Sequence, residues 1–306
     1  KTGNNEAAVR YWWEITNKEK WAKMTKGGPF NRWYGNTWTR VIVENDFEYI
    51  KLQNSYSIPS VRNIECITFP TSGSGRISFR MIDADTIYNN ASNAINSPDN
   101  KLLLGVLNSK MSDYALESLN PTVNTTVGDI QRLPLFNFND ISADNKSLIK
   151  NIVSQNINIK KNQHKYSLIE EAYKESPIGF KYDVAIEIQK FYALENALLT
   201  QILLNESIIN RTVFEVYELS EHDKQMVLDK EGIPVGDLPV SHEAKVAYKQ
   251  WLMSESEFKP TSDVLKHLEN LEERTDLPQI TDFDTLYQNN NEWEEFCIKR
   301  NVNPVE

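Results

Sequence analysis

The hydrophobic pattern is most regular between Leu102 and Leu119. Apolar side chains recur there every three to four residues, which is typical of an α-helix with one buried face. Turn and cap residues from Ser97 to Asn100 precede this segment. Asn120-Pro121 ends it, because a residue before proline disfavours helical geometry. A polar Asn/Thr loop and an apolar run from Ile130 to Leu135 follow. The pattern alone predicts a buried core helix and an exposed turn.

Alternating and β-branched segments before residue 140 predict strands. Trp38 to Val43 is one such segment. Ile64 to Phe69 and Arg76 to Met81 predict a hairpin around a polar Ser/Gly turn. Strict alternation would place Arg76 and Arg80 on one face, opposite the apolar side chains. An arginine-bearing face suits the reading of a DNA groove, whereas the plainer interpretation is a solvated sheet face.

After Asn139-Asp140 the pattern becomes helical. Leu148 to Ile157 predicts an amphipathic helix, followed by an irregular stretch up to Pro177. Tyr182 to Tyr217 is the longest helical candidate, since apolar residues repeat at helical spacing without Pro or Gly. Three shorter helices are predicted at His242 to Met253, Thr261 to Arg274 and Tyr287 to Lys299.

These elements predict an α+β fold in two domains. Residues 1–140 would form a small twisted, mostly antiparallel sheet with the Leu102 helix packed on it. Residues 141–306 would form a mostly helical C-terminal domain. The composition, 40% hydrophobic and 25% charged, is normal for a globular protein. Because no segment approaches the ~20 apolar residues of a membrane span, we expect no membrane association.

Two further features concern origin and compartment. A chain that opens at Lys1, without the apolar core of a signal peptide, is expected to be a fragment. Cys66 and Cys297 lie far apart and predict neither a disulfide framework nor a metal cluster. They fit a reducing cytoplasm.

The charge is distributed unevenly along the chain. The net charge is −10, but residues 1–140 carry 15 basic and 14 acidic residues, and the remainder carries 18 and 29. Non-specific DNA affinity depends on the number of phosphates that basic side chains neutralise. The first 140 residues are therefore the better candidate for a DNA-reading surface, and the acidic remainder predicts solvated helix faces.

Longer residue patterns narrow the class. The stretches LLGVLNSK, NPT and VGDIQRLPL after Lys101 resemble the target recognition region of adenine-specific DNA methyltransferases. KGGPFNRWYGN, from Lys26 to Asn36, is similar to a signature of PglX-like methyltransferases of BREX phage-defence systems. TGNNEAAVRYWWEI from Thr2 and NESIINRTVFEV from Asn205 fit the same family, although Ala7-Ala8 replaces a larger, partly basic pair.

The catalytic motifs of such enzymes are missing from this sequence. Adenine methyltransferases carry a [DN]-P-P-[YF] motif that holds the flipped base, and this chain contains no Pro-Pro pair. The Ser72 to Gly75 segment lacks the strand-turn-helix setting of a nucleotide loop. His242-Glu243 lacks the second histidine of a zinc-protease helix, because Val246 stands in its place. We expect all four histidines to be surface residues and no metal site to form.

The resemblance implies that this chain is the C-terminal target recognition portion of an N6-adenine DNA methyltransferase. The complete enzyme would methylate a short asymmetric site with S-adenosylmethionine bound in the missing catalytic domain, and this chain alone would be inactive. Implied partners are double-stranded DNA, other BREX proteins and phage inhibitors. The candidate DNA-binding residues are Lys26, Arg32, Tyr34, Asn36, Arg62, Ser72, Ser74, Arg76, Arg80, Lys110 and Asn124.

Two alternatives remain open at this point. One is the specificity region of a fused type II restriction-modification enzyme, which shares the Leu102 signature. The other is a protein-interaction scaffold without a DNA role. Sequence upstream of Lys1 would separate the first from a methyltransferase, and salt-dependent binding of duplex DNA would separate both from a scaffold.

Overall fold

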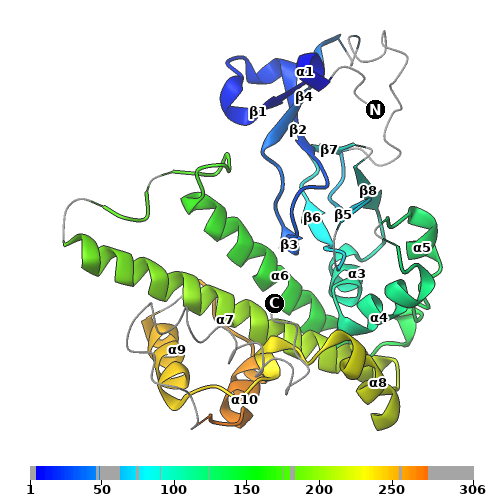
Figure 1. Ribbon diagram of the computed structural model, residues 1–306, viewed down its shortest axis with the longest axis vertical. Helices are drawn as coiled ribbons and strands as arrows, with labels where there is room; N and C mark the ends of the chain where they lie inside the picture. Colours follow the sequence, from blue (N-terminus) through cyan, green and yellow to red (C-terminus); the bar gives the residue numbers. More distant parts are fainter. Residues whose placement is uncertain are drawn as a thin grey trace. The chain divides into compact units, whose positions relative to one another are not determined.

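The computed structural model describes residues 5–45, 48, 63–73, 76–89, 91–122, 124–174, 176–179, 183–254 and 257–274. The fold is α+β, as predicted, with strands in the first hundred residues and helices after them (Figure 1). Two compact units divide the chain. Unit 1 is Lys1–Asn108, Ala115–Pro134 and Ile157–Glu187, and unit 2 is Ser109–Tyr114, Leu135–Asn156 and Ile188–Glu306. No single boundary separates these units, so the domain boundary at residue 140 stays a prediction.

The first sheet of unit 1 has the order β1-β4-β2-β7. Its strands are β1 (Val9–Tyr11), β4 (Thr39–Ile42), β2 (Trp21–Thr25) and β7 (Thr86–Tyr88). The short helix α1 (Asn5–Ala8) precedes β1. Strand β4 runs antiparallel to both β1 and β2, whereas β7 is parallel to β2. Ala8, Met24 and Val41 form the buried cluster of this sheet, and β4 confirms the strand predicted from Trp38.

The second sheet has the order β3-β6-β5-β8. Its strands are β3 (Trp33–Tyr34), β6 (Arg80–Ile82), β5 (Cys66–Pro70) and β8 (Ser92–Ile95). The predicted hairpin is present, because β5 and β6 pair antiparallel with Ile67 opposite Met81. Strand β3 runs parallel to β6, so both sheets are mixed.

The hairpin differs from the prediction in length and in its faces. Strand β6 begins at Arg80 rather than at Arg76. The backbone of Phe79, just before it, is bonded to the side chain of Asn108. Phe79, Arg80 and Met81 are all at most 1% exposed. The predicted accessible face carrying Arg76 and Arg80 is therefore wrong for Arg80, because alternation identifies an accessible face only where one side of a sheet meets water.

The Leu102 segment forms two helices rather than one. Helix α3 (Asn100–Leu107) is capped by Asp99, whose side chain accepts the backbone N–H of Leu102. The predicted burial of this helix is confirmed, and it extends to every residue from Leu102 to Leu107 and not to one face alone. The helix stops at Asn108, and α4 (Lys110–Leu119) starts two residues later. Helix α5 (Val127–Gln131) follows, with a capping box between Thr126 and Asp129.

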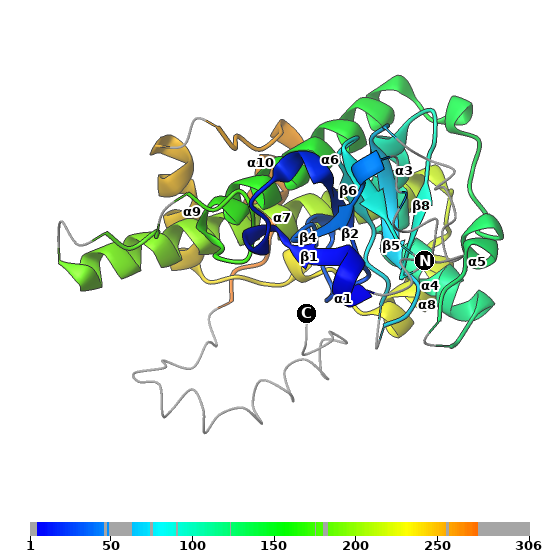
Figure 2. The same ribbon diagram turned by 90° about the horizontal axis from the view of Figure 1, so that it is seen from above.

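The remaining helices form most of unit 2 (Figures 1 and 2). They are α6 (Ala143–Gln163), α7 (Val184–Val216), α8 (Glu221–Glu231), α9 (His242–Ser254) and α10 (Ser262–Asn270). Helix α6 extends into the predicted irregular stretch as far as Gln163, since no Pro or Gly interrupts it there and Ile157 and Ile159 bury their side chains. Short 3-10 turns span Trp12–Glu14, Lys18–Lys20, Phe138–Asp140, His164–Tyr166 and Val235–Asp237.

Unit 2 contains a buried polar chain that joins its helices. The Asn205 amide donates to Asn156 Oδ1 at 2.7 Å, and Gln201 Nε2 donates to Asn205 Oδ1 at 2.9 Å. The Tyr248 hydroxyl of α9 donates to Gln201 of α7. All four side chains are buried. These hydrogen bonds favour one helix register, because a slip would break them in a buried setting, although Asn156 Nδ2 itself has no partner among the described residues.

Three further predictions concern core and membrane. Cys66 is 2% exposed and belongs to the core, as expected; burial raises the pKa of its thiol to about 11. Among the described residues, no helix has the length and apolar character required to cross a bilayer. The predicted helix from Tyr287 to Lys299 lies outside the described residues, as does most of the Phe47 to Leu52 segment.

Candidate nucleic-acid interface

The loop from Lys26 to Asn36 is held from inside by Asn36. This side chain is 2% exposed, and its amide donates to the carbonyls of Gly27 at 3.0 Å and Pro29 at 2.9 Å. Gly28 and Asn36 both adopt positive φ, 67° and 60°, a conformation that glycine and asparagine tolerate best. The DNA contact predicted for Asn36 stays a prediction, and the structure disfavours it because the hydrogen-bonding groups of Asn36 are used within the loop.

Arg80 fastens the same loop from the second sheet. It is fully buried, and one terminal nitrogen donates to the carbonyls of Lys26 at 3.0 Å and Gly27 at 2.6 Å. Burial lowers the pKa of its guanidinium to about 10. Its predicted placement on a DNA-facing surface is wrong. Hydrogen bonds to a charged donor are the stronger kind, so Arg80 stabilises the loop backbone.

Tyr34 belongs to a polar cluster within unit 1. Its hydroxyl donates to Asp83 Oδ2 at 2.6 Å, and the ammonium of Lys161 lies 4.4 Å from its ring centroid. Lys161 also pairs with Asp83 at 2.8 Å. Burial and the Asp83 carboxylate raise the pKa of Tyr34 above its ordinary value. These contacts occupy both the ring and the hydroxyl, which favours a structural role.

The apex of the loop is accessible. Phe30 is 61% exposed, and the Arg32 guanidinium lies 5.4 Å from its ring centroid. Lys26 and Arg32 are half-buried. The loop thus presents an aromatic ring beside a cation, and of the four residues predicted here for DNA contact, Lys26 and Arg32 keep a suitable position.

A second accessible edge joins Ser72 to Asn124. These residues form an isolated antiparallel bridge, and the N–H of Thr125 donates to the carbonyl of Thr71 at 3.0 Å. Ser72 and Asn124 are both exposed, and Arg76 is half-buried. The fold therefore brings together two predicted residues that lie 52 positions apart. Arg62 and Ser74 lie outside the described residues.

Lys110 is buried within unit 2. It is 4% exposed, and its ammonium donates to the carbonyl of Glu231 at 2.9 Å in unit 2. Its backbone N–H donates to Asn210 Oδ1 at 2.7 Å, so a residue of α7 caps α4. The DNA contact predicted for Lys110 stays a prediction, and the burial of this side chain in helix packing disfavours it.

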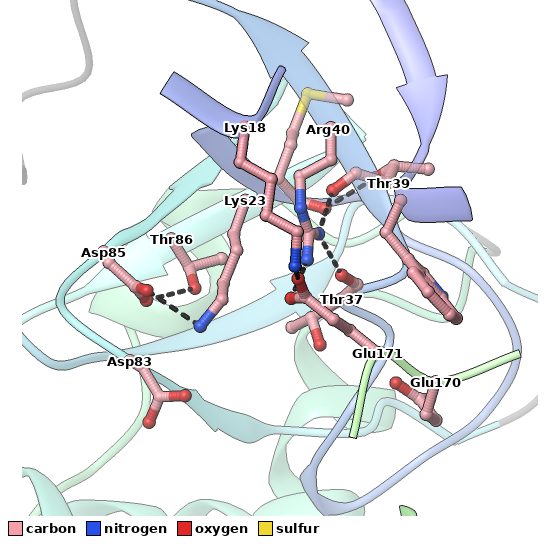
Figure 3. A network of polar contacts seen from close by, with 12 residues as sticks. Lys18, Lys23, Thr37, Thr39, Arg40, Asp83, Asp85, Thr86, Glu170 and Glu171 are labelled. Carbon is pink, nitrogen blue, oxygen red and sulfur yellow. Dashed lines mark hydrogen bonds and ion pairs between the residues drawn. The ribbon is translucent and has the colours of Figure 1, made fainter. Parts of the chain in front are cut away.

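Residues that the sequence did not single out form a polar network around Arg40 (Figure 3). Arg40 is 3% exposed and donates to the carbonyls of Thr37 and Thr39, each at 2.8 Å. It also pairs with the Glu171 carboxylate, which Lys18 approaches to 3.0 Å. The network fastens the segment after α6 to the first sheet within unit 1. No sequence signal joins Arg40 to Glu171, 131 residues later.

His164 and Glu170 form a buried pair in the same segment. His164 Nδ1 lies 3.6 Å from Glu170 Oε2. Burial lowers the pKa of His164 to about 4, with Lys160 and Lys161 adding to the shift. Burial raises the pKa of Glu170 to about 7 against an opposing effect of Arg40. His164 is therefore neutral at pH 7. The two side chains do not form an ion pair at this pH, although they lie within ion-pair distance.

The prediction of four surface histidines is wrong for His164, which is 9% exposed, and for His267, whose side chain is 12% exposed. His164 packs against Gly35, where an added Cβ would lie 3.2 Å from the imidazole. In the described part of the chain, no group of three His, Cys, Asp or Glu side chains could hold a metal ion. The accessible side chains can form hydrogen bonds through Ser72 and Asn124, stack through Phe30 and attract phosphate through their basic groups.

Relatives of this chain include adenine-specific methyltransferases, although no protein-family model matches it. Over 160 residues it is 28% identical to the adenine-specific methyltransferase PglX of Lacticaseibacillus casei (strain Zhang), which covers 44% of this chain and 13% of that protein. Over 250 residues it is 23% identical to the adenine-specific methyltransferase BrxX of Escherichia coli O9:H4 (strain HS), which covers 76% and 20%. The chain thus spans at most a fifth of these relatives.

A solved structure shares the fold. The type IIL restriction-modification enzyme MmeI, determined in complex with DNA, aligns with a TM-score of 0.51 and 13% identity, over 74% of this chain and 33% of that one. At this identity the alignment carries the fold alone. The chain is therefore similar in sequence to part of adenine-specific methyltransferases and similar in fold to part of a restriction-modification enzyme.

Proposed function

We propose that this chain is the DNA target recognition portion of a site-specific N6-adenine DNA methyltransferase of a BREX phage-defence system. The observation that carries the proposal is the similarity to two adenine-specific methyltransferases, one of them over 76% of this chain. The fold likeness to MmeI, whose structure contains DNA, supports the same reading.

The methyl transfer itself is assigned to the part of the protein outside this chain. The sequence here has no Pro-Pro pair and so lacks the adenine-holding motif of such enzymes. S-adenosylmethionine would therefore bind elsewhere in the complete protein. In this proposal, the role of this chain is to select the DNA sequence that is methylated.

The DNA-reading surface is placed on unit 1. Accessible candidates are the apex of the Lys26 to Asn36 loop and the edge where Ser72 meets Asn124. The hydroxyl of serine and the amide of asparagine can hydrogen-bond to base edges. The guanidinium of Arg76 can bind guanine or phosphate. The buried Asn36, Arg80 and Lys110 would support this surface or the helices without touching DNA.

The test uses the full-length protein. Genome-wide methylation mapping should find one modified adenine site, and binding to a duplex carrying that site should weaken as salt rises. Arg76→Ala and Asn124→Ala should relax the site or weaken binding about 5- to 150-fold if they read bases, which corresponds to ~1–3 kcal/mol per contact. Arg211→Ala is the matched control, because Arg211 is an exposed arginine of unit 2.

The outcomes separate the alternatives. An unchanged site and unchanged affinity for both unit 1 variants would place the DNA surface elsewhere. A full-length protein without salt-dependent DNA binding would favour the scaffold interpretation. Uniform weakening on all sequences, with a salt slope reduced by about one, would make Arg76 a phosphate contact.

The fold likeness to MmeI favours one second candidate. In that case this chain would be the specificity region of a fused restriction-modification enzyme. Incubating the full-length protein with unmodified plasmid and Mg²⁺ distinguishes the two. Cleavage at a fixed distance from the methylated site supports the second candidate, and methylation without cleavage supports the first.

A further inference from the structure

The Lys26 to Asn36 loop presents Phe30 in an unusual way. Phe30 is 61% exposed and follows Gly28 and Pro29, which are also exposed. Single exposed apolar side chains are common on protein surfaces and need no function. Two features distinguish Phe30 from such side chains: the way the loop beneath it is held, and the cation beside its ring.

The backbone beneath Phe30 is fixed by two buried side chains. Arg80 donates to the carbonyls of Lys26 and Gly27, and Asn36 donates to those of Gly27 and Pro29. Arg80 and Asn36 come from a strand of the second sheet and from the far end of the loop. An exposed aromatic side chain on a rigid base loses little conformational entropy when it binds a partner.

A cation lies directly beside the ring. The Arg32 guanidinium is 5.4 Å from the Phe30 centroid, within the range of a cation–π contact. Aromatic rings stack on nucleic-acid bases and apolar wedges insert between base steps, while arginine attracts the adjacent phosphates. This pairing fits DNA better than it fits an apolar protein surface, which would have to desolvate the guanidinium.

We propose that Phe30 inserts into the base stack of the bound DNA duplex, with Arg32 on the neighbouring backbone. The proposal rests on the proposed function and adds a stacking residue to it. An enzyme that modifies a base must take it out of the stack, and a rigid aromatic side chain stabilises the opened step. In this arrangement Arg80 and Asn36 are positioning residues, because they act through the loop backbone.

The test uses full-length protein and a duplex in which 2-aminopurine replaces the methylated adenine. Wild-type protein should raise the fluorescence of this base, which increases when stacking is lost. Phe30→Ala should reduce that rise and weaken binding roughly 5- to 150-fold, the range for loss of one stacked base. Phe30→Trp should restore both. Tyr192→Ala is the matched control, since Tyr192 is an aromatic residue of unit 2 that is 62% exposed.

Salt dependence separates stacking from charge. Phe30→Ala should lower the affinity equally at every salt concentration, because phenylalanine releases no counterion. Arg32→Ala should instead reduce the salt slope by about one. If wild-type protein binds DNA and Phe30→Ala keeps its affinity and fluorescence, the insertion is overturned and the proposed function stands. If wild-type protein does not bind DNA at all, both are overturned.

Discussion

The side chain of Asn108 pairs with the backbone of Phe79 as a neighbouring strand would. Asn108 Oδ1 accepts the N–H of Phe79 at 3.1 Å, and its amide donates to the Phe79 carbonyl at 2.9 Å. Asn108 is 3% exposed, so water does not compete. The residue that ends α3 therefore also satisfies the chain just before β6, within unit 1.

Replacing Asn108 should destabilise unit 1. Asn108→Ala leaves the buried N–H of Phe79 without this acceptor, which costs ~1–3 kcal/mol of unfolding free energy. Asn108→Asp keeps the acceptor but loses the donor and buries a charge, so it should cost at least as much. Urea unfolding measures both. Asn139→Ala, an exposed site, should stay within about 0.5 kcal/mol of wild type, and similar values for all variants would contradict the pairing.

Leu107→Ala tests whether α3 is a core helix. Leu107 is fully buried, so the substitution removes apolar contacts and leaves a cavity. The expected cost is ~2–5 kcal/mol of unfolding free energy. Leu168→Ala makes the same change at a side chain that is 74% exposed and should have a small effect. A thermal melt that does not separate the two variants would show that α3 is not core.

Periodicity predicted elements with clear local signals. The Leu102 face, the Trp38 strand and the pairing of the segments after Ile64 and before Ile82 all follow from apolar spacing, and the structure confirms them. Periodicity does not predict that the helix is interrupted at Asn108. That break depends on a hydrogen-bond partner 29 residues earlier, and the surrounding residues continue a helical pattern.

The same limit explains the site residues. Alternation along the strand places Arg76 and Phe79 on opposite faces. It gives no information about which face the loop at Gly27 covers, and for this reason it predicts Arg80 to be exposed. His164 follows a polar run of α6, and its burial depends on Gly35 and Glu170. Side-chain type alone suggested DNA contacts for residues whose donors are used by backbone carbonyls.

This chain should not bind S-adenosylmethionine. The proposed catalytic centre lies in another part of the protein, and the sequence lacks a Pro-Pro motif. Calorimetric titration of the chain with the cofactor should give no heat beyond dilution, while the full-length protein should bind it. Stoichiometric binding to the chain alone, in the micromolar range, would contradict the proposal that the cofactor binds in another part of the protein.

The His164–Glu170 pair predicts opposite pH dependences for two variants. In Glu170→Gln, His164 remains, with a pKa lowered from 6.5 to about 4. The unfolded chain then binds a proton that the folded chain does not, so stability falls as the pH drops from 6.5 to 4. In His164→Gln, Glu170 remains, with a pKa raised from 4.5 to about 7. Here the folded chain holds the extra proton, so stability falls as the pH rises from 4.5 to 7.

In the wild type these two slopes oppose each other between pH 4.5 and 6.5, because one group favours high pH and the other favours low pH. Urea unfolding at pH 4.5, 5.5 and 6.5 should therefore give diverging lines for the two variants, each changing by about 2 kcal/mol in opposite directions, so that they differ from each other by about 4 kcal/mol across the window. His222→Gln and Glu19→Gln make the same two substitutions at exposed sites and serve as controls. Parallel lines for His164→Gln and Glu170→Gln would mean that these side chains are hydrated in solution and that the segment after α6 is packed differently.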